Sequence, residues 1–452
     1  MEIILLSLFT KKLTTISQDT NLLTLSKATL FSLLLQFVAA LIHFLLLIFL
    51  ARLLGVQGYG NYIYVLAWIN ILVLLAKFGL DLTLVRYVAA YESQQQWSYL
   101  RGVIIWSFKV TLLLTVFINC LLLSTLWLLA DKINSQLVDL FLIGTVLIFL
   151  LSIIELYQGI LRGLHRVLLS FLVKHILRPL FLGIIVLFLY LFKISLSSQL
   201  TMVMHTCAAL LVFIIATRLV IHCLPVEVKI SQTLFKDKEW LITALPLFFI
   251  IGSYMIMSQT DIVMLGILKE SEISGIYSAV VNITTFVTFG LTAFNNFAAP
   301  MVSKLHTLGK QKALQQMLSF AAWGILGFAV TASLFLMITG KWLLSLFGSA
   351  FIQGYPVLIL LLLGQIINAL SGSVNLIATM TGHQIIAAKI IAMGAGLNIL
   401  LNLILIPPWG MLGAAIATSL TTIFWNLVLL RFVHQQLGIN PTVLPLKPVI
   451  NR

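Results

Sequence analysis

Three charged residues stand close together near the end of a long apolar stretch: Lys77, Asp81 and Arg86. A charge inside a bilayer is costly, and such residues usually pair with one another, face a protein interior or mark a pathway. Lys77 and Asp81 are four residues apart, a spacing that allows an ion pair at a helix end. Arg86 can mark the helix end or contact anionic headgroups. The spacing allows either a structural ion pair or a charged site.

Three further charges lie beside other apolar stretches: Arg52, Arg178 and Asp261. Tyr254 precedes Asp261 by seven residues, which places both on one face of a helix. Asp261 can therefore cap its helix, or it can belong to a polar face that lines a cavity. Arg178 directly precedes Pro179, and Arg52 follows an apolar run.

Neutral polar residues recur at helical spacing in several apolar stretches, so they share one face of each helix. The positions are Ser32, Gln36 and His43; Thr284, Thr288, Thr292 and Asn296, with Asn295 adjacent; Gln365, Asn368, Asn375 and Thr379; and Asn398 and Asn402. Singly, such residues usually form hydrogen bonds between helices. Several striped helices together also predict a hydrated central cavity. Both interpretations stay open.

The sequence contains no pattern of residues that supports catalysis. A phosphate-binding glycine loop, a nucleophile elbow and an HExxH zinc motif are absent from it. The eight histidines lack the spacing of metal ligands, and the three cysteines lie in or beside apolar stretches. We therefore expect no catalytic residue, no metal site and no cofactor, and the protein is not expected to be an enzyme.

These residues belong to a chain with the composition of a helical membrane protein. Of its 452 residues 61% are hydrophobic and 9% are charged, whereas roughly a quarter are charged in soluble proteins. Apolar runs of about 20 residues, the length that crosses a bilayer, recur throughout. We predict an all-α polytopic fold with twelve transmembrane helices, at 28–50, 61–82, 103–129, 137–160, 169–191, 199–221, 241–266, 275–300, 314–338, 355–378, 384–406 and 411–433.

The net charge of +14 is explained by topology and does not predict nucleic-acid binding. With this count of spans, 22 of the 27 basic residues fall on one side of the membrane. Basic residues concentrate in cytoplasmic loops, so both termini are predicted to be cytoplasmic. The predicted organisation is a cytoplasmic lead-in (1–27), an N-terminal lobe (28–222), a cytoplasmic linker (223–240), a C-terminal lobe (241–433) and a cytoplasmic tail (434–452).

Several blocks of sequence, taken in order, resemble a known family. They are LARLLGVQGYGNY, KFGLDLTLVRYVA, LPLFFIIGSYMIMSQTDIVMLGIL, SGIYSAV, FNNFAAPMVSKLH, GQIINALSGSVNLIATMTGH and LNLILIPPWGMLGAAIATSL. Together they resemble the bacterial polysaccharide-unit flippases, the Wzx-type members of the MOP exporter superfamily, over about residues 25–435. The blocks are specific for the superfamily and less specific for a substrate.

The resemblance implies an inner-membrane protein with two pseudo-symmetric six-helix lobes, similar to MATE transporters, around a central cavity. It implies that the protein moves an undecaprenyl-diphosphate-linked oligosaccharide, such as an O-antigen repeat unit, from the cytoplasmic to the periplasmic leaflet by alternating access. The implied partners are this glycan lipid, the bilayer and other membrane proteins of polysaccharide assembly. A cation-coupled antiporter for drugs or metabolites is the alternative. A membrane enzyme of the same pathway is a third hypothesis, which the short loops argue against.

Each candidate site residue has an expected role under this resemblance. A diphosphate favours cationic side chains, so we expect Lys77, Arg86 and Arg178 at the cytoplasmic mouth of the cavity, with Arg52 on the opposite side. Neutral polar side chains suit sugar hydroxyls, and the candidates are Tyr254, Asn295, Gln365, Asn368 and Asn375. Asp261 is a candidate site for a coupling proton or sodium ion, or a counter-charge for an arginine in the cavity.

Overall fold

Long helices that run along one axis account for almost all of the described chain. The computed structural model describes residues 20–129, 131–132 and 134–443, and within these ranges it contains helices and no strands. The helices are α2 (Thr20–Lys77), α3 (Leu80–Ser93), α4 (Trp97–Leu128), α5 (Ser135–Gly163), α6 (Val167–Phe171), a π-helix η1 (Leu172–Leu177), α7 (Arg178–Leu191), α8 (Ser198–Cys223), α9 (Val226–Ile230), α10 (Asp237–Leu268), α11 (Ser271–Thr307), α12 (Gln311–Phe347), a 3₁₀-helix η2 (Ser349–Gly354), α13 (Tyr355–Leu370), α14 (Val374–Met380), α15 (Gln384–Trp409) and α16 (Met411–Leu437).

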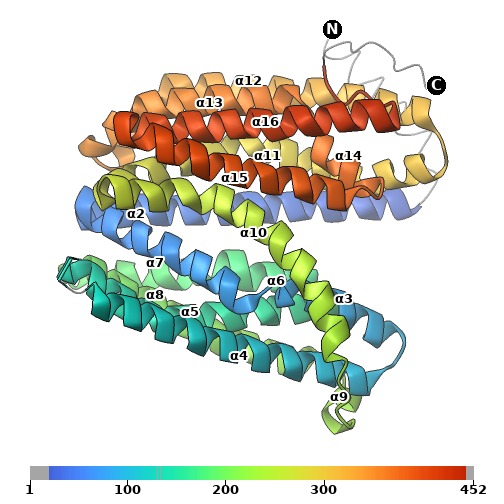
Figure 1. Cartoon of the computed structure of the whole chain (residues 1–452), viewed down its shortest axis with the longest axis horizontal. Helices are drawn as coiled ribbons and strands as arrows, with labels where there is room; N and C mark the ends of the chain where they lie inside the picture. The colour runs from blue at the N-terminus through green and yellow to red at the C-terminus, as the bar shows by residue number, and fades with distance from the viewer. Residues whose placement is uncertain (1–19, 130, 133, 444–452) are drawn as a thin grey trace.

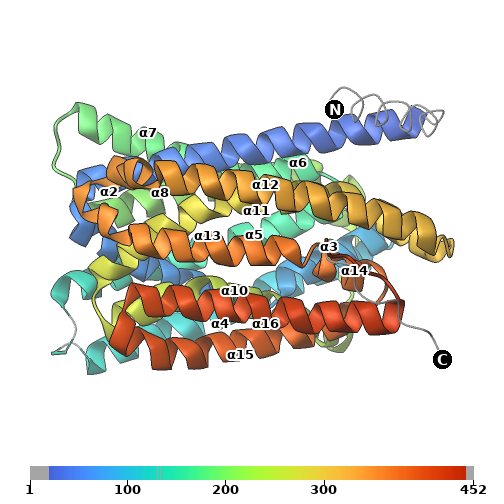
Figure 2. The same cartoon turned by 90° about the horizontal axis from the view of Figure 1, so that it is seen from above.

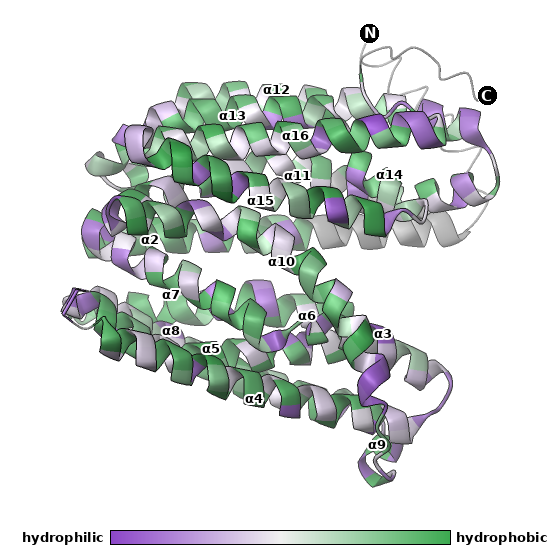
Figure 3. Ribbon diagram, in the orientation of Figure 1, coloured by the Kyte–Doolittle hydropathy of each residue, from purple (hydrophilic) through white to green (hydrophobic). Residues whose placement is uncertain are grey.

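The predicted all-α membrane fold is confirmed. Eleven helical segments of the described chain are long and apolar enough to cross a bilayer. The first, Leu34–Lys77, covers most of the first and of the second predicted span, so counting its two arms separately gives the predicted twelve. Figure 3 shows that hydrophobic residues occupy much of the length of the helices. Many large apolar side chains are exposed, and Ile338 of α12 is 83% exposed. Contact of such an apolar surface with lipid is favourable, whereas its exposure to water would be unfavourable.

The boundary between the first two spans differs from the prediction. The sequence predicted a loop between residues 50 and 61, but α2 is helical on both sides of Gly55, the single residue with non-helical dihedral angles (φ 68°, ψ 175°). Glycine adopts a positive φ without a steric penalty, so one residue is enough to redirect the chain. The helix also begins at Thr20, within the predicted lead-in; residues 1–19 lie outside the described chain, as do residues 444–452 of the predicted tail.

Three other predicted spans are interrupted where the sequence predicted continuous helix. The second span ends at Lys77, and a turn at Phe78 and Gly79, both with positive φ, leads into α3. The tenth span breaks between α13 and α14. The fifth contains the π-helix η1. These breaks place irregular backbone inside predicted spans, which membranes tolerate only where protein surrounds it or where it lines a water-filled cavity.

The helices form two groups that α2 and α10 connect. Figure 1 shows α3–α9 in the lower group and α11–α16 in the upper group, with α2 and α10 crossing between them, and Figure 2 shows the same bundle from above. Before Gly55, α2 packs against the upper group through Phe44, whose ring contacts Phe286 and Phe347. After Gly55, it packs against α5, where Ile69 contacts Gly144. The predicted boundaries at 222 and 240 stay predictions.

The crossing helix α10 is fixed at its start by aromatic packing against the lower group. Trp240 is fully buried, donates its indole N–H to the Tyr91 hydroxyl at 3.1 Å and packs against Trp106. Pro246 lies inside the helix, where a proline removes one backbone hydrogen bond and bends the axis. Gly79, which precedes α3, lies so close to α10 near Pro246 that a Cβ on Gly79 would be 2.7 Å from the Ala244 carbonyl oxygen. The first turns of α10 therefore belong to the packing of α3 and α4.

Candidate functional site

A cavity of about 600 Å³ lies where the two groups of helices face each other. Its walls come from the first arm of α2, from the segment α6–η1–α7, and from α11. The polar lining residues are Gln36, His43, Lys174, His175, Arg178 and Thr292. The first arm of α2 and α11 contribute neutral polar groups and one imidazole, whereas the η1 and α7 wall contributes the cations.

The cavity carries positive charge that the protein does not fully neutralise. Lys174 and Arg178 both line it, and no carboxylate is among its lining residues. Arg178 forms no hydrogen bond or ion pair within the described residues, although Glu155 lies close enough to interact with it electrostatically. A guanidinium group offers five N–H donors in a planar fork that matches phosphate and carboxylate oxygens. An unpaired arginine in a cavity is therefore a site for an anionic ligand.

A chain of ion pairs connects the cavity to the interior of the lower group. Lys77 Nζ lies 2.9 Å from Asp81 Oδ2 and 3.0 Å from Glu155 Oε2, and Lys174 Nζ lies 2.9 Å from Glu155 Oε1. The ion pair between Lys77 and Asp81, one of the two interpretations that their spacing allowed, is present, and it is buried and spans the break between α2 and α3. Gly159 of α5 permits this approach, since a Cβ at that position would overlap the Asp81 carbonyl oxygen.

The cationic wall of the cavity is built on an irregular stretch of helix. Lys174 and His175 lie within η1, and Arg178 and Pro179 follow at the start of α7. A π-helix is wider than an α-helix and occurs mostly as short insertions at functional sites. Proline has no N–H, so Pro179 cannot complete the backbone pattern across the junction. The irregular stretch of helix and the basic residues therefore coincide at one wall of the cavity.

A second polar centre lies within the upper group of helices, around the carboxylate of Asp261. Tyr277 donates its hydroxyl to Asp261 Oδ2 at 2.5 Å, and Asn402 donates its amide to Oδ1 at 2.7 Å. Thr418 donates to Oδ2, and Asn398 lies at the edge of hydrogen-bond range from Oδ1, at 3.5 Å. The four partners come from α11, α15 and α16, whereas Asp261 belongs to α10. No lysine or arginine in the described chain pairs with this carboxylate.

The other polar residues predicted on the C-terminal helices form smaller contacts. Tyr254 accepts a hydrogen bond at 2.9 Å from the amide of Asn375, which connects α10 to α14. Asn368 donates to Gln365 and accepts from Asn426 of α16. Asn295 has a buried amide oxygen without a hydrogen-bond partner among the described residues. None of these predicted residues lines the cationic cavity.

Of the predicted cationic residues, only Arg178 lines the cavity. Lys77 is 5% exposed and is engaged in the chain of ion pairs. Arg86 is exposed on α3, with its guanidinium 5.7 Å from the centroid of the Tyr87 ring. Arg52 donates from Nε to the Leu346 carbonyl oxygen at 2.6 Å and from Nη2 to that of Ser345 at 2.8 Å. These four residues therefore occupy four different environments.

The sequence interpretation missed Lys174, His175 and Glu155 as members of the site. Lys174 precedes Arg178 by four residues, which places both on one helical face, and that signal was available in the sequence. Glu155 lies 19 residues from Lys174 and 78 from Lys77, so only the fold shows that it joins them. His43 was on a predicted polar stripe, and it does line the cavity.

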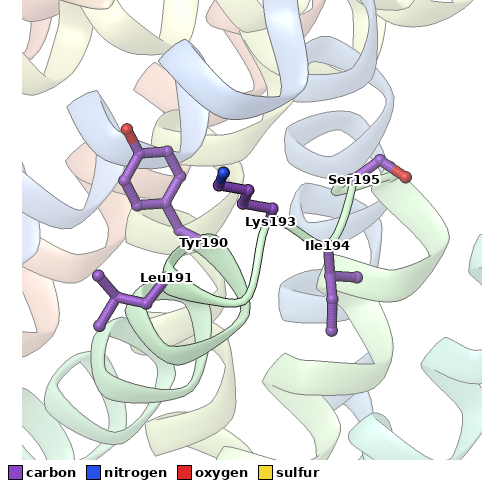
Figure 4. A pocket seen from close by; sticks show the side chains of 5 residues that line it. All are labelled: Tyr190, Leu191, Lys193, Ile194 and Ser195. Carbon is purple, nitrogen blue, oxygen red and sulfur yellow. The ribbon is translucent and has the colours of Figure 1, made fainter.

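A second cavity, of about 480 Å³, lies at the turn between α7 and α8. Figure 4 shows Tyr190, Leu191, Lys193, Ile194 and Ser195 around it, with Tyr190 and Lys193 on the same side and Ser195 apart. Lys193 is its single charged group, and every lining residue comes from one turn. The cavity between the two groups of helices is the stronger candidate site because it combines several charges from separate elements.

Comparison with solved structures shows which known proteins share this fold. The chain matches an inward-facing MATE family multidrug resistance transporter of the MOP superfamily with a TM-score of 0.68, at 16% identity, covering 85% of this chain and 93% of the other. It matches the lipid II flippase MurJ with a TM-score of 0.66, at 18% identity and with coverages of 90% and 87%. A MOP superfamily transporter from Pyrococcus furiosus, described as having a binding pocket of reversed polarity, matches with a TM-score of 0.59, at 14% identity and with coverages of 90% and 93%.

Comparison of sequences identifies the family. An uncharacterised membrane protein of Methanocaldococcus jannaschii is 24% identical over 421 residues, which cover 87% of this chain and 80% of the relative. Residues 25–306, more than half of the chain, match the family model described as polysaccharide biosynthesis protein. The resemblance that the sequence blocks indicated is confirmed: the chain belongs to the polysaccharide biosynthesis protein family and has the fold of the MOP exporter superfamily.

Proposed function

We propose that this protein flips an undecaprenyl-diphosphate-linked oligosaccharide, such as an O-antigen repeat unit, from the cytoplasmic to the periplasmic leaflet of a bacterial inner membrane. Membership of the polysaccharide biosynthesis protein family supports a glycan lipid as the substrate class. The observation that carries the proposal is the cationic cavity between the two groups of helices, with Arg178 unpaired among the described residues. Alternating access exposes such a cavity to each leaflet in turn.

The chemistry of the cavity fits the charged part of that substrate. A diphosphate linkage is strongly anionic, and hydrogen bonds between charged partners are shorter and about twice as strong as neutral ones. Arg178 and Lys174 supply these donors, and Gln36 and Thr292 supply neutral groups that can both donate to and accept from sugar hydroxyls. The polyprenyl tail requires no polar site, because it can lie against large apolar side chains that the helices expose, such as Ile338.

The proposal is tested by complementation in the native host. Deletion of the gene should trap lipid-linked repeat units on the cytoplasmic face, and the wild-type gene should restore surface glycan. Arg178→Ala should lose most export, and Arg178→Lys should recover part of it, because lysine keeps the charge and loses the fork. Arg218→Ala is the matched control, since Arg218 is exposed on α8. Normal surface glycan in the deletion strain would contradict the proposal.

A cation-coupled antiporter for drugs or metabolites is the second candidate function. The observation that favours it is the buried carboxylate of Asp261, with no basic partner in the described chain. That function predicts drug sensitivity in the deletion strain with intact surface glycan. The two candidates therefore give opposite results in one pair of assays.

We further propose that Asp261 couples transport to a proton or sodium ion. The Asp261 carboxylate can take up a proton. Together with the oxygen atoms of the two amides and two hydroxyls around it, the carboxylate can also bind a hard cation. Asn402 also has a buried amide oxygen without a hydrogen-bond partner in the described chain, which is available to a cation. Asp261→Asn should reduce gradient-driven export while binding of a diphosphate probe is retained. Asp139→Asn, on an exposed carboxylate of α5, is the control.

We propose a bacterial inner-membrane location with both termini in the cytoplasm. The distribution of basic residues supports this orientation. The structure brings the start of α2, the α9 segment and the end of α16 toward the same end of the molecule (Figure 1). A cytoplasm-active fluorescent protein fused after Arg452 should fluoresce, whereas alkaline phosphatase fused there should be inactive. The reverse result would contradict the orientation.

We propose other membrane proteins of polysaccharide assembly as partners, and co-purification with them tests this proposal.

A further inference from the structure

We propose that Glu155 is an internal substitute for the anionic group of the substrate: it holds Lys174 while the cavity is empty and gives Lys174 up when a diphosphate binds. The inference rests on the proposed function, because it concerns how the same cavity binds and releases its ligand. It assigns to Glu155 the role of a positioning residue that limits affinity and drives release.

The contacts of Glu155 place it between one accessible and one inaccessible lysine. Its Oε1 lies 2.9 Å from Lys174 Nζ, and its Oε2 lies 3.2 Å from Lys174 Nζ and 3.0 Å from Lys77 Nζ. The Lys174 side chain is 39% exposed and lines the cavity, whereas the Lys77 side chain is 7% exposed. An anion in the cavity can therefore reach Lys174 but not Lys77.

Glu155 can release Lys174 without becoming an unpaired buried charge. Removing one partner of a buried ion pair is strongly unfavourable when the remaining charge has no other partner. Here Lys77 retains Glu155 through Oε2, and Asp81 retains Lys77 at 2.9 Å. The exchange therefore moves Lys174 from one anion to another while the rest of the chain of ion pairs stays intact.

The side chain of Lys174 and the charges around it support this exchange. A lysine side chain is a flexible point charge with three donors, which can be shared between two anions or transferred from one to the other. Arg178, which forms no ion pair in the described chain, lies on the next turn and completes the anion site. The three cations Lys77, Lys174 and Arg178 outnumber the two carboxylates Asp81 and Glu155, so a binding anion meets a net positive cluster.

This arrangement has a consequence for the transport cycle. A flippase must release its substrate on the far side, and binding that is too tight in the ground state slows turnover. The carboxylate of Glu155 competes with the diphosphate for Lys174 and so weakens binding and favours release. Removing the charge of Glu155 should therefore increase the affinity for a diphosphate and decrease export. A residue with a merely structural role would not change these two quantities in opposite directions.

The test uses the purified full-length protein in lipid nanodiscs, with geranylgeranyl diphosphate as the probe. For Glu155→Gln we expect the Kd of the probe to fall about tenfold, which corresponds to ~1.4 kcal/mol, while export of surface glycan in cells decreases. Glu155→Asp keeps the charge on a shorter side chain, so its Kd should lie between those of wild type and Glu155→Gln, with export retained. Glu239→Gln, which removes an exposed carboxylate paired with Lys236, should change neither quantity.

A second variant identifies Lys174 as the group for which the two anions compete. If Glu155 acts mainly through Lys174, adding Glu155→Gln to Lys174→Gln should change the Kd much less than Glu155→Gln changes it in wild type, because coupled residues are not additive. The electrostatic interaction of Glu155 with Arg178 accounts for the small remaining change. An unchanged Kd in Glu155→Gln beside a wild-type melting temperature would overturn the inference. If Glu155→Gln does not fold, an unchanged Kd in Glu155→Asp would overturn it equally.

Failure of the proposed function gives a different result. If wild type does not bind geranylgeranyl diphosphate, or binds it equally well with Arg178→Ala, the cavity is not the diphosphate site and the proposed function loses its support. If wild type binds the probe in an Arg178-dependent manner and Glu155→Gln binds it with the same affinity, only the role of Glu155 is overturned.

Discussion

At the scale of single residues, burial distinguishes charges that look alike in the sequence. Asp261 and Asp81 both lie at or near helix ends, and both are less than 5% exposed. Asp81 pairs with a lysine, whereas Asp261 is surrounded by hydroxyls and amides. A buried carboxylate with only neutral hydrogen-bond donors around it keeps its net negative charge and can bind a cation. A carboxylate in an ion pair is already neutralised by its partner. The neighbours, and not the residue type, determine which role is available.

Tyr277→Phe tests how strongly the Asp261 centre stabilises the upper group of helices. The variant removes one hydroxyl that donates to Asp261 at 2.5 Å and leaves the ring in place. We expect the free energy of unfolding to fall by about 1.5–3 kcal/mol, the usual value of a hydrogen bond to a charged group. Denaturation in mixed micelles measures it, with Tyr190→Phe as the control, because Tyr190 is 53% exposed. Equal stabilities of the two variants would contradict the expectation.

Arg52→Ala tests whether that arginine supports a helix end. Its guanidinium donates to the carbonyls of Ser345 and Leu346 at the last turn of α12, where free carbonyls and the helix dipole favour a cation. We expect a loss of about 0.5–1 kcal/mol in the free energy of unfolding, with an unchanged Kd for geranylgeranyl diphosphate. A large increase in that Kd would instead support the predicted role of Arg52 in receiving the substrate.

At the scale of secondary-structure elements, glycines determine where helices from the two halves of the chain can meet. Gly60 of α2 and Gly275 of α11 face each other so closely that a Cβ on Gly275 would lie 2.7 Å from the Gly60 Cα. The neighbouring side chains of Asn61 and Ser271 are hydrogen-bonded across the same junction. Each glycine is followed two residues later by a tyrosine, Tyr62 and Tyr277, so the two positions match in sequence. The structure shows that these matching positions contact each other.

Gly275→Ala tests this contact between α2 and α11. The added methyl group has no free space, so the two helices must separate, and overpacking of this kind costs about 1–3 kcal/mol. Gly396→Ala is the matched control, because nothing lies within 4 Å of a Cβ at that helical glycine. We expect a lower melting temperature for Gly275→Ala and an equal or higher one for Gly396→Ala, since alanine favours helix. Reversed melting temperatures would contradict the close contact.

At the scale of the whole molecule, two groups of helices face each other across the cavity, and the junction around Gly60 and Gly275 holds them together at one place. Phe44 and its aromatic partners hold the first arm of α2 to the upper group. Under the proposed alternating access, we expect this junction to open while the opposite end of the molecule closes. The cationic cavity would then face the other leaflet while keeping the same lining residues.

A reversible cross-link tests whether this junction must open. Asn61→Cys together with Ser271→Cys, in a background without Cys120, Cys207 and Cys223, places two thiols where the side chains now form a hydrogen bond. We expect oxidation to stop export of surface glycan and reduction to restore it. Each single cysteine variant should export normally under both conditions. Full export by the oxidised double variant, with the cross-link verified by mass spectrometry, would contradict the requirement.

The sequence by itself determined the class of the protein, the twelve spans and the family. Hydrophobic segment length, the alternation of basic loops and ordered sequence blocks are properties of neighbouring residues, so they can be read without a fold. Helical spacing placed Asp261 on one face with Tyr254, and its charge beside an apolar stretch made Arg178 a candidate. Such local patterns could not show the break at Phe78 and Gly79 or the π-helix η1, because packing between distant helices stabilises these irregular conformations.

Only the tertiary structure decided which of the polar residues act together. Glu155 meets Lys77 across 78 residues of sequence, and Asn402 meets Asp261 across 141. Such pairs have no spacing signature, since their distance depends on how whole helices pack and cross. The same packing buried Lys77, left Arg86 on the surface, directed Arg52 to the end of α12 and left Arg178 in the cavity. Charge and hydropathy made these residues candidates, and helix packing gave each one its environment.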